Sequence, residues 1–151
     1  MSTATGTREV PEPRADVWRA LAVLQPYCPV CDVSYVVEGS GRRTTFVAVA
    51  GRLEGEPPAG APRGRIVEWV PGRQVGTELE LTPETWTTRI ELADTATGGT
   101  RVTMTVTHRP RRGSRPARWL LGRAARSMVR RTVESELDKV PAHVALVARG
   151  S

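Results

Sequence analysis

The sequence predicts an α+β fold in which a series of antiparallel strands lies between a short N-terminal helix and a long C-terminal helix. Two observations support this prediction. Between residues 30 and 110, apolar residues recur at every second position in several places, which is typical of strands with one buried face. From residue 116 to about 148 they recur at intervals of three and four, as on one face of an α-helix.

The N-terminal segment predicts one strand followed by a short helix. Residues 4–10 (ATGTREV) form the expected strand, and the proline pair in VPEPRADVW closes it. The same passage is a good helix start, because Glu12 or an adjacent residue can cap the helix and Pro13 suits its first turn. Prolines at positions 26 and 29 end the helix, which is therefore short.

The middle of the chain predicts a sheet of six to seven strands, counting the N-terminal one. Turn signals such as Gly39-Ser40-Gly41 and Pro71-Gly72 separate the strands. The expected strands are residues 32–38, 43–55, 64–70, 73–82, 85–93 and 100–109. The face of strand 43–55 that is buried stays open at this stage.

The last segment predicts a helix from Pro116 to about Ala148. Seven residues can fall near its apolar face: Leu121, Ala125, Met128, Thr132, Leu137, Val140 and Val144. Pro141 is expected to end or kink this helix. The 151 residues are expected to form a single domain, with residues 1–5 and 148–151 as flexible tails.

Composition and charge exclude several classes of protein. No apolar run approaches the roughly 20 residues that span a bilayer, and the N-terminus has no apolar signal segment, so a cytoplasmic location is expected. The chain has 22 basic and 16 acidic residues, for a net charge of +6. Nine arginines and no acidic residue lie between Arg109 and Arg131, so the basic character is local to that segment.

The stretch PYCPVCDV contains the only two cysteines, Cys28 and Cys31, at C-x-x-C spacing. A redox pair of the thioredoxin type begins a helix, whereas this pair follows one. A zinc site needs more ligands, and only His108 and His143 remain, with no motif that places them. We favour two structural or pocket-rim thiols, with a reversible disulfide and a metal site as alternatives, and no metal or cofactor is expected.

The passages VPEPRADVWRAL, GTRVTMTVTH and VESELDKVPAHV, within residues Arg8 to Val144, resemble the START-like (SRPBCC) superfamily. Within it, the chain is similar to the bacterial polyketide cyclase/dehydrase and lipid-transport group. The resemblance implies a helix-grip fold, in which a curved antiparallel sheet wraps the C-terminal helix around a deep cavity. Such proteins bind lipids, sterols or polyketides. Some of them catalyse cyclisation or dehydration, and no catalytic motif is common to the superfamily.

If the apolar sheet face is turned toward the C-terminal helix, it lines this cavity, although the same side chains can instead fill a solid core. Three helix residues are expected to join the lining: Arg126, Met128 and Thr132. The expected sheet residues are Val33, Tyr35, Val37, Trp69, Leu79, Trp86, Thr88, Ile90, Met104 and Val106. Tryptophan and tyrosine suit a pocket that is mostly apolar with few polar groups.

Few polar groups are available for catalysis. Tyr35 can donate a hydrogen bond to a carbonyl or enolate oxygen, and His108 can act as acid or base near neutral pH. Glu136 lies among the apolar positions of the helix, and an ion pair with a nearby arginine is favoured over a catalytic role for it. No nucleophile motif, metalloprotease motif or phosphate loop is present, so hydrolysis and phosphoryl transfer are disfavoured.

This inventory favours a cyclase that folds a hydrophobic, polyketide-like intermediate, as in natural-product biosynthesis, because positioning alone can lower the barrier to ring closure. The alternative is a non-catalytic protein that binds or transports a hydrophobic ligand or a lipid. The arginine segment 109–131 is either a solvated helix face with a loop or a contact for one of two candidate partners, an acyl carrier protein or an anionic lipid surface. A homodimer is a separate candidate that is not tied to this segment. Nucleic acid is disfavoured, because no recognition motif is present.

Overall fold

The computed structural model describes residues 1–81, 84–110 and 115–149, with residues 115–123 described by their backbone alone. The elements of this part are β1 (Ser2–Val10), α1 (Arg14–Ala22), β2 (Tyr27–Cys28), β3 (Val33–Glu38), the 3₁₀ turn η1 (Gly41–Arg43), β4 (Thr45–Ala50), β5 (Arg63–Val70), β6 (Gln74–Leu81), β7 (Glu84–Asp94), β8 (Thr100–Pro110) and α2 (Arg115–Arg149). This order confirms the predicted α+β class.

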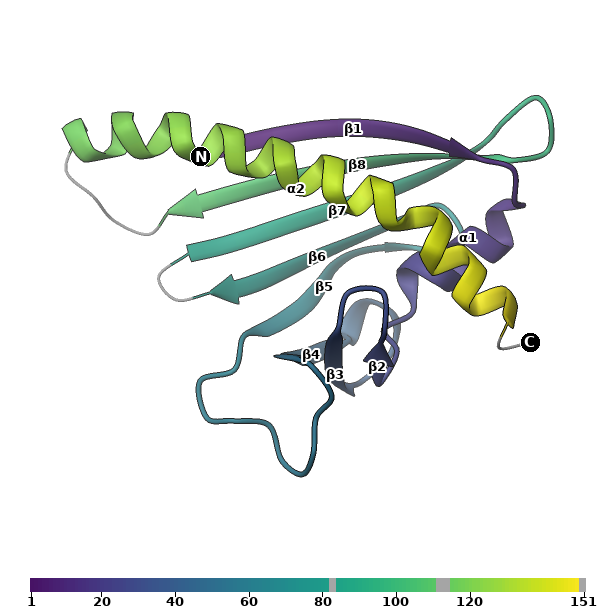
Figure 1. Cartoon of the computed structure of the whole chain (residues 1–151), viewed down its shortest axis with the longest axis horizontal. Coiled ribbons are helices and arrows are strands. Elements are labelled where there is room, and N and C mark those ends of the chain that lie inside the picture. The colour runs from purple at the N-terminus through teal and green to yellow at the C-terminus, as the bar shows by residue number, and fades with distance from the viewer. Residues whose placement is uncertain (82–83, 111–114, 150–151) are drawn as a thin grey trace.

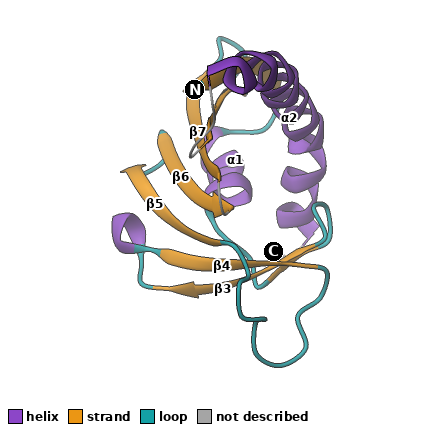
Figure 2. Ribbon diagram, turned by 90° about the vertical axis from the view of Figure 1, so that its left-hand side faces the viewer, coloured by secondary structure: helices purple, strands orange, loops and turns teal. Residues whose placement is uncertain are grey.

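All strands belong to one antiparallel sheet with the order β1-β8-β7-β6-β5-β4-β3-β2. The helix α2 runs across β1 and β8 (Figure 1). Seen from the side, the sheet curls from β7 toward β3, and α1 lies at one end of the space between the sheet and α2 (Figure 2). This is the helix-grip arrangement that the resemblance implied.

The first strand is longer than predicted, and residues 2–5 are not a flexible tail. β1 pairs with β8 from Ser2, opposite His108, to Val10, opposite Thr100. On the outer face, threonines of the two strands hydrogen-bond in the pairs Thr3–Thr107 and Thr5–Thr105. On the inner face Ser2, Ala4 and Gly6 are small, and α2 lies close to the sheet at Gly6.

The structure corrects the strand prediction at two places, near the C-x-x-C pair and at the end of β4. The short strand β2 was not predicted, and it pairs with the start of β3. β4 ends at Ala50 rather than at residue 55, because Gly51, with φ 75°, turns the chain away. The other strands lie within a few residues of their predicted bounds.

Helix α1 begins without the expected side-chain cap. Pro13 occupies the N-cap position and offers no capping group, and the Glu12 carboxylate does not cap the helix in its place. Val17 is completely buried against the main core. Burial of this residue therefore stabilises α1 where capping does not.

Helix α2 continues to Arg149 and passes through Pro141, which was expected to end or kink it. Val140 and Val144, the buried residues on either side of this proline, hold both turns against the core. At Gly6 of β1 the helix is so close that a Cβ would lie 2.7 Å from Cγ1 of Val133. The structure describes residue 149 as helical, and residues 150 and 151 lie outside the described part.

The register of the strands shows which residues share the inner face of the sheet. Facing pairs run across the sheet from Val106 to Thr88 and from Thr88 to Thr77. Beyond them, Gly64 faces both Leu79 and Phe46, and Phe46 faces Val37. The inner residues of β4 are therefore Phe46 and Ala48, which settles the face that was left open. No described helix is long and apolar enough to cross a membrane.

Candidate functional site

A cavity of about 140 Å³ lies where α1, the β2–β3 loop and the C-terminal half of α2 meet over the sheet. Its floor is formed by Ile90 and Met104, on neighbouring strands. The remaining lining residues are Ala20, Leu21, Val23, Leu24, Gln25, Cys28, Cys31, Tyr35, Glu136, His143, Leu146 and Val147. Most of these side chains are apolar, and the polar ones other than Gln25 come from β2, the β2–β3 loop, β3 and α2.

Tyr35 presents the only phenol of the cavity lining. Its ring packs edge-on against Phe46, with ring centroids 5.8 Å apart. Burial raises the pKa of Tyr35 to about 12, so the hydroxyl is protonated near neutral pH. Among the described residues this hydroxyl has no hydrogen-bond partner, so it is free to donate to a guest in the cavity.

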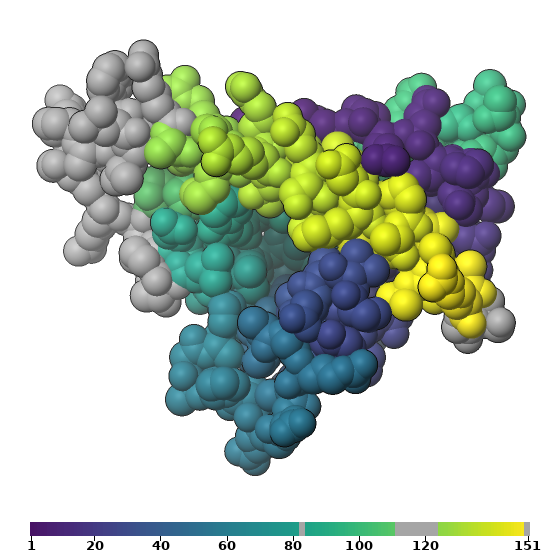
Figure 3. Space-filling model, viewed as in Figure 1, coloured from purple at the N-terminus to yellow at the C-terminus, as the bar shows by residue number. Residues whose placement is uncertain are grey.

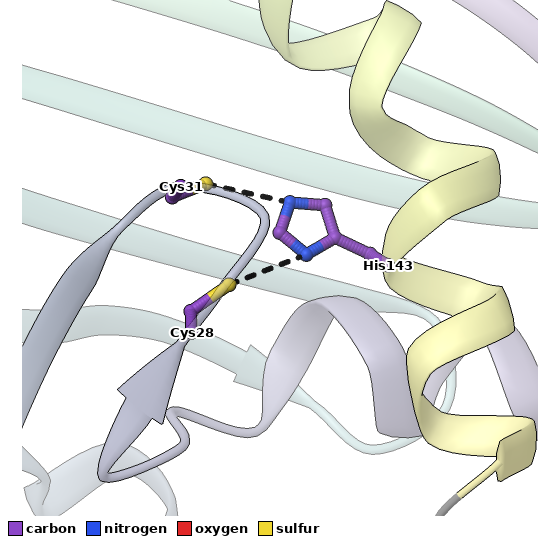
Figure 4. A group of neighbouring side chains, drawn as sticks. All are labelled: Cys28, Cys31 and His143. Carbon is purple, nitrogen blue, oxygen red and sulfur yellow. Dashed lines mark hydrogen bonds between the residues drawn. The ribbon is translucent and has the colours of Figure 1, made fainter.

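Cys28, Cys31 and His143 form a second polar group in the same cavity (Figure 4). The Cys28 sulfur lies 3.7 Å from Nδ1 of His143, and the Cys31 sulfur lies 3.5 Å from Nε2. Both cysteines are free thiols. The sequence analysis found no motif that brings a histidine to the pair, and the structure places one there.

Burial favours the neutral forms of Cys31 and His143 in this group. Burial, and after it the carboxylate of Glu136, raise the pKa of the Cys31 thiol to about 11. Burial also lowers the pKa of His143. Glu136 itself accepts a hydrogen bond of 3.1 Å from Nζ of Lys139, one turn along the helix. The Cys31 thiol is therefore not an activated nucleophile in this state.

A second hollow, of about 570 Å³ and open to solvent, follows the N-terminal part of the described α2 side chains. Two predicted lining residues, Met128 and Thr132, border it, together with Ala124, Ser127, Arg131, Ser135 and Glu136. Figure 3 shows that the surface is recessed below this part of α2. Glu136 borders both hollows, so this groove adjoins the cavity.

Apart from Met128 and Thr132, which border this groove, the predicted lining residues fall into three groups. Tyr35, Ile90 and Met104 line the cavity. Val33, Leu79, Trp86 and Thr88 are half-buried on the same face of the sheet but outside this cavity. The rest differ from the prediction: Val106 is core, Trp69 packs on Trp18 with centroids 5.1 Å apart, Val37 is 40% exposed, and Arg126 is exposed on α2.

His108, the predicted acid or base, does not border the cavity. It lies four residues beyond Met104 on β8, which is about 13 Å along a strand. It is 4% exposed, its ring is 4.8 Å from that of Trp86, and its Nε2 lies 3.3 Å from a carboxylate oxygen of Glu84. Of the two predicted polar helpers, Tyr35 therefore borders this cavity and His108 does not.

Sequence reasoning did not place His143 in the cavity wall, whereas the two thiols, for which it favoured a structural or pocket-rim role, do border the cavity. A signal for His143 was present, since residues 136, 140, 143 and 147 repeat at three- and four-residue intervals on one helix face. The arginine segment 109–131 lies mostly outside the described side chains. Its described members, Arg109, Arg126, Arg130 and Arg131, are exposed.

Comparison with known proteins agrees with the architecture. The family model described as polyketide cyclase / dehydrase and lipid transport matches residues 1–145. None of the curated protein sequences compared with the chain matches it.

Solved structures with the same fold share little sequence with this chain. A Thermus thermophilus protein has a TM-score of 0.69 at 20% identity, with 95% of this chain and 97% of that chain covered. Ara h 8.0201 has a TM-score of 0.67 at 17% identity, with 97% of both chains covered. A Mesorhizobium loti protein has a TM-score of 0.61 at 18% identity, with 95% and 96% covered. These likenesses establish a Bet v 1-like helix-grip fold.

Proposed function

Because this chain belongs to the polyketide cyclase/dehydrase and lipid-transport family, we propose that it binds a small hydrophobic molecule with a hydrogen-bond acceptor beneath α2. The observation that carries the proposal is the apolar cavity with the Tyr35 hydroxyl in its wall and no protein partner for that hydroxyl among the described residues. An apolar guest gains free energy from burial, and the phenol orients it by one hydrogen bond.

The volume of the cavity limits the size of the molecule that can bind in it. Pockets for drug-sized ligands enclose roughly 300 to 1,000 Å³, whereas the cavity holds about 140 Å³. A larger guest would extend past Glu136 into the groove beside Met128 and Thr132. We expect a molecule with a compact acceptor-bearing end in the cavity and an apolar remainder along α2.

Binding is tested with purified protein and the dye 1-anilinonaphthalene-8-sulfonate. We expect saturable fluorescence at one dye per chain, which a straight-chain fatty acid or a flat aromatic ketone displaces in competition. Solvent extraction of the freshly purified protein, followed by mass spectrometry, identifies any guest carried through purification. Dye binding that does not saturate, and that no hydrophobic competitor reduces, would contradict the proposal.

A ring-forming reaction is the second candidate, and it is favoured by the presence of Glu136 in the same cavity wall as Tyr35. Glu136 would take a proton from the carbon between two carbonyl groups of a poly-β-ketone. Tyr35 would donate to the enolate oxygen, the enolate carbon would form a bond to a second carbonyl carbon, and the new alkoxide would take back the proton.

This candidate is tested by incubating the protein with a linear poly-β-ketone and following the ring product by mass spectrometry and NMR. We expect Glu136→Gln to remove the reaction while a bound ketone is retained. Recovery of the ketone unchanged from the wild-type complex would leave ligand binding as the function.

A further inference from the structure

The three potential metal ligands in the cavity wall come from segments far apart in the chain. Cys28 ends β2, Cys31 lies in the β2–β3 loop, and His143 lies on α2. One ligand atom from each lies within 4.8 Å of the others. Figure 4 shows both sulfurs and the imidazole ring turned toward one another.

The loop that carries the thiols is fixed in shape. Asp32, directly after Cys31, has a φ of 53°, a left-handed conformation that turns the chain back into β3. Its carboxylate accepts a hydrogen bond of 2.7 Å from the hydroxyl of Tyr27, and its carbonyl accepts one of 2.8 Å from the amide of Gly51. The loop therefore presents both cysteines on one side, and C-x-x-C is a spacing that zinc sites use.

The position of His143, the third potential ligand, is set by the packing of α2. Val140 and Val144, on either side of His143, are completely or almost completely buried in the main core. This packing fixes the backbone from which His143 reaches the loop. The ligands are thus positioned by the fold and not by a bound ion.

The separations fit a tetrahedral zinc ion. Zinc–sulfur bonds of about 2.3 Å and zinc–nitrogen bonds of about 2.0 Å place a sulfur about 3.5 Å from a nitrogen and about 3.8 Å from another sulfur. The sulfur–nitrogen distances are 3.5 and 3.7 Å, to the two different ring nitrogens. Because zinc binds a single ring nitrogen, the imidazole has to rotate so that one nitrogen faces both sulfurs, and the ligand atoms, which lie within 4.8 Å of one another, have to move closer together.

We propose that Cys28, Cys31 and His143 form a binding site for Zn²⁺ or a similar thiophilic divalent cation, with the fourth coordination position open to the cavity. Two thiolates and an imidazole are ligands that zinc prefers. Binding releases the two thiol protons, and the thiolates then balance the charge of the ion, so the partly buried site gains no net charge. Three protein ligands and an open position are the arrangement of zinc sites that also bind a water or a guest.

The fourth coordination position of the metal is open to the cavity because of where the three protein ligands lie. All three border the cavity, so the fourth ligand is a cavity water or a donor atom of a guest. Glu136 and Lys139, the charged groups on the adjoining turn of α2, are paired with each other. This inference does not depend on the proposed guest, because the metal is measured in protein stripped of any ligand.

The test is a titration of reduced, chelator-treated protein with Co²⁺, followed by displacement with Zn²⁺. We expect one Co²⁺ per chain, with the thiolate charge-transfer band in the near ultraviolet and the d–d bands of tetrahedral cobalt. Cys28→Ser, Cys31→Ser and His143→Gln should each weaken binding by more than the roughly 10- to 100-fold that loss of an outer-shell partner costs. His108→Gln, a change at the other histidine, should bind as the wild type does.

Circular dichroism and titration of the two thiols verify that each protein is folded and reduced. Folded, reduced wild type without a charge-transfer band would overturn the proposal, as would bands that persist unchanged in His143→Gln. Oxidation to a Cys28–Cys31 disulfide gives a second readout, since bound Zn²⁺ should slow it at least several-fold. Equal oxidation rates with and without Zn²⁺ would point to a thiol–disulfide pair instead.

Discussion

His143 on α2 lies 3.5 Å from the sulfur of Cys31, although 112 positions separate the two residues. The contact joins the C-terminal half of the helix to the β2–β3 loop at the wall of the cavity. It therefore links the two elements between which a guest is expected to bind.

The Tyr35 hydroxyl should contribute to ligand affinity and little to stability. We expect Tyr35→Phe to weaken binding of a ketone or fatty acid by roughly 2- to 10-fold, the value of one hydrogen bond, with an unchanged melting temperature. Calorimetric titration measures the affinity. Thr7→Val is the control, because it removes a hydroxyl from the exposed outer face of β1, and Thr7 does not border the cavity. Equal losses of affinity in both variants would remove Tyr35 from its assigned role.

Gly6 should be required for the close contact between β1 and α2. A Cβ at this position would lie 2.7 Å from Cγ1 of Val133 and 2.8 Å from Cδ1 of Leu137. We expect Gly6→Ala to lower the free energy of unfolding by about 1 to 3 kcal/mol, as overpacking does. Thr7→Ala, one residue along on the exposed face, should change it by less than about 0.5 kcal/mol. Urea denaturation measures both, and a Gly6→Ala protein as stable as Thr7→Ala would contradict the packing described for α2.

The pair of Glu68 and Arg89 on the outer face should make a small part of the stability depend on pH. Arg89 donates to the Glu68 carboxylate at 2.8 and 2.9 Å, and these bonds hold the pKa of Glu68 below its ordinary value of 4.5. The contribution is therefore present above pH 4.5 and is lost as the pH falls through the lower folded pKa. Because both side chains are more than a third exposed, it is at most about 1 kcal/mol.

A double-mutant cycle measures this contribution. Glu68→Gln and Arg89→Gln should each remove the same acid-dependent part of the unfolding free energy, and the double variant should lose little more than either one. Losses that add fully at pH 7 would mean that the two residues do not interact.

The sequence was sufficient to predict which residues share the inner face of the sheet, but not to predict which positions along each strand border the cavity. The alternation that places Tyr35, Ile90 and Met104 on the inner face is local, and the strand register confirms that they share it. His108 shares this alternation too, but it lies beyond the cavity, because alternation does not say where along β8 the cavity ends. The end of the cavity along β8 depends on where α1 and the β2–β3 loop cross the sheet.

The sequence did not predict the contacts between distant segments that build the candidate site. His143 meets the cysteines only because α2 continues through Pro141, where the prediction expected an end or a kink. Buried neighbours outweigh the loss of one backbone hydrogen bond at this proline. The hydrophobic pattern also did not predict the tight turn at Asp32, a non-glycine residue with positive φ.

The most direct test of the account is whether filling the cavity removes ligand binding. Ile90→Trp adds an indole ring at the cavity floor, and Val36→Trp adds the same group on the opposite face, at an exposed position of β3. Native mass spectrometry with a fatty acid or a flat aromatic ketone should show a 1:1 complex with the wild type and with Val36→Trp, and none with a folded Ile90→Trp. An equally abundant complex with Ile90→Trp would contradict a binding site beneath α2.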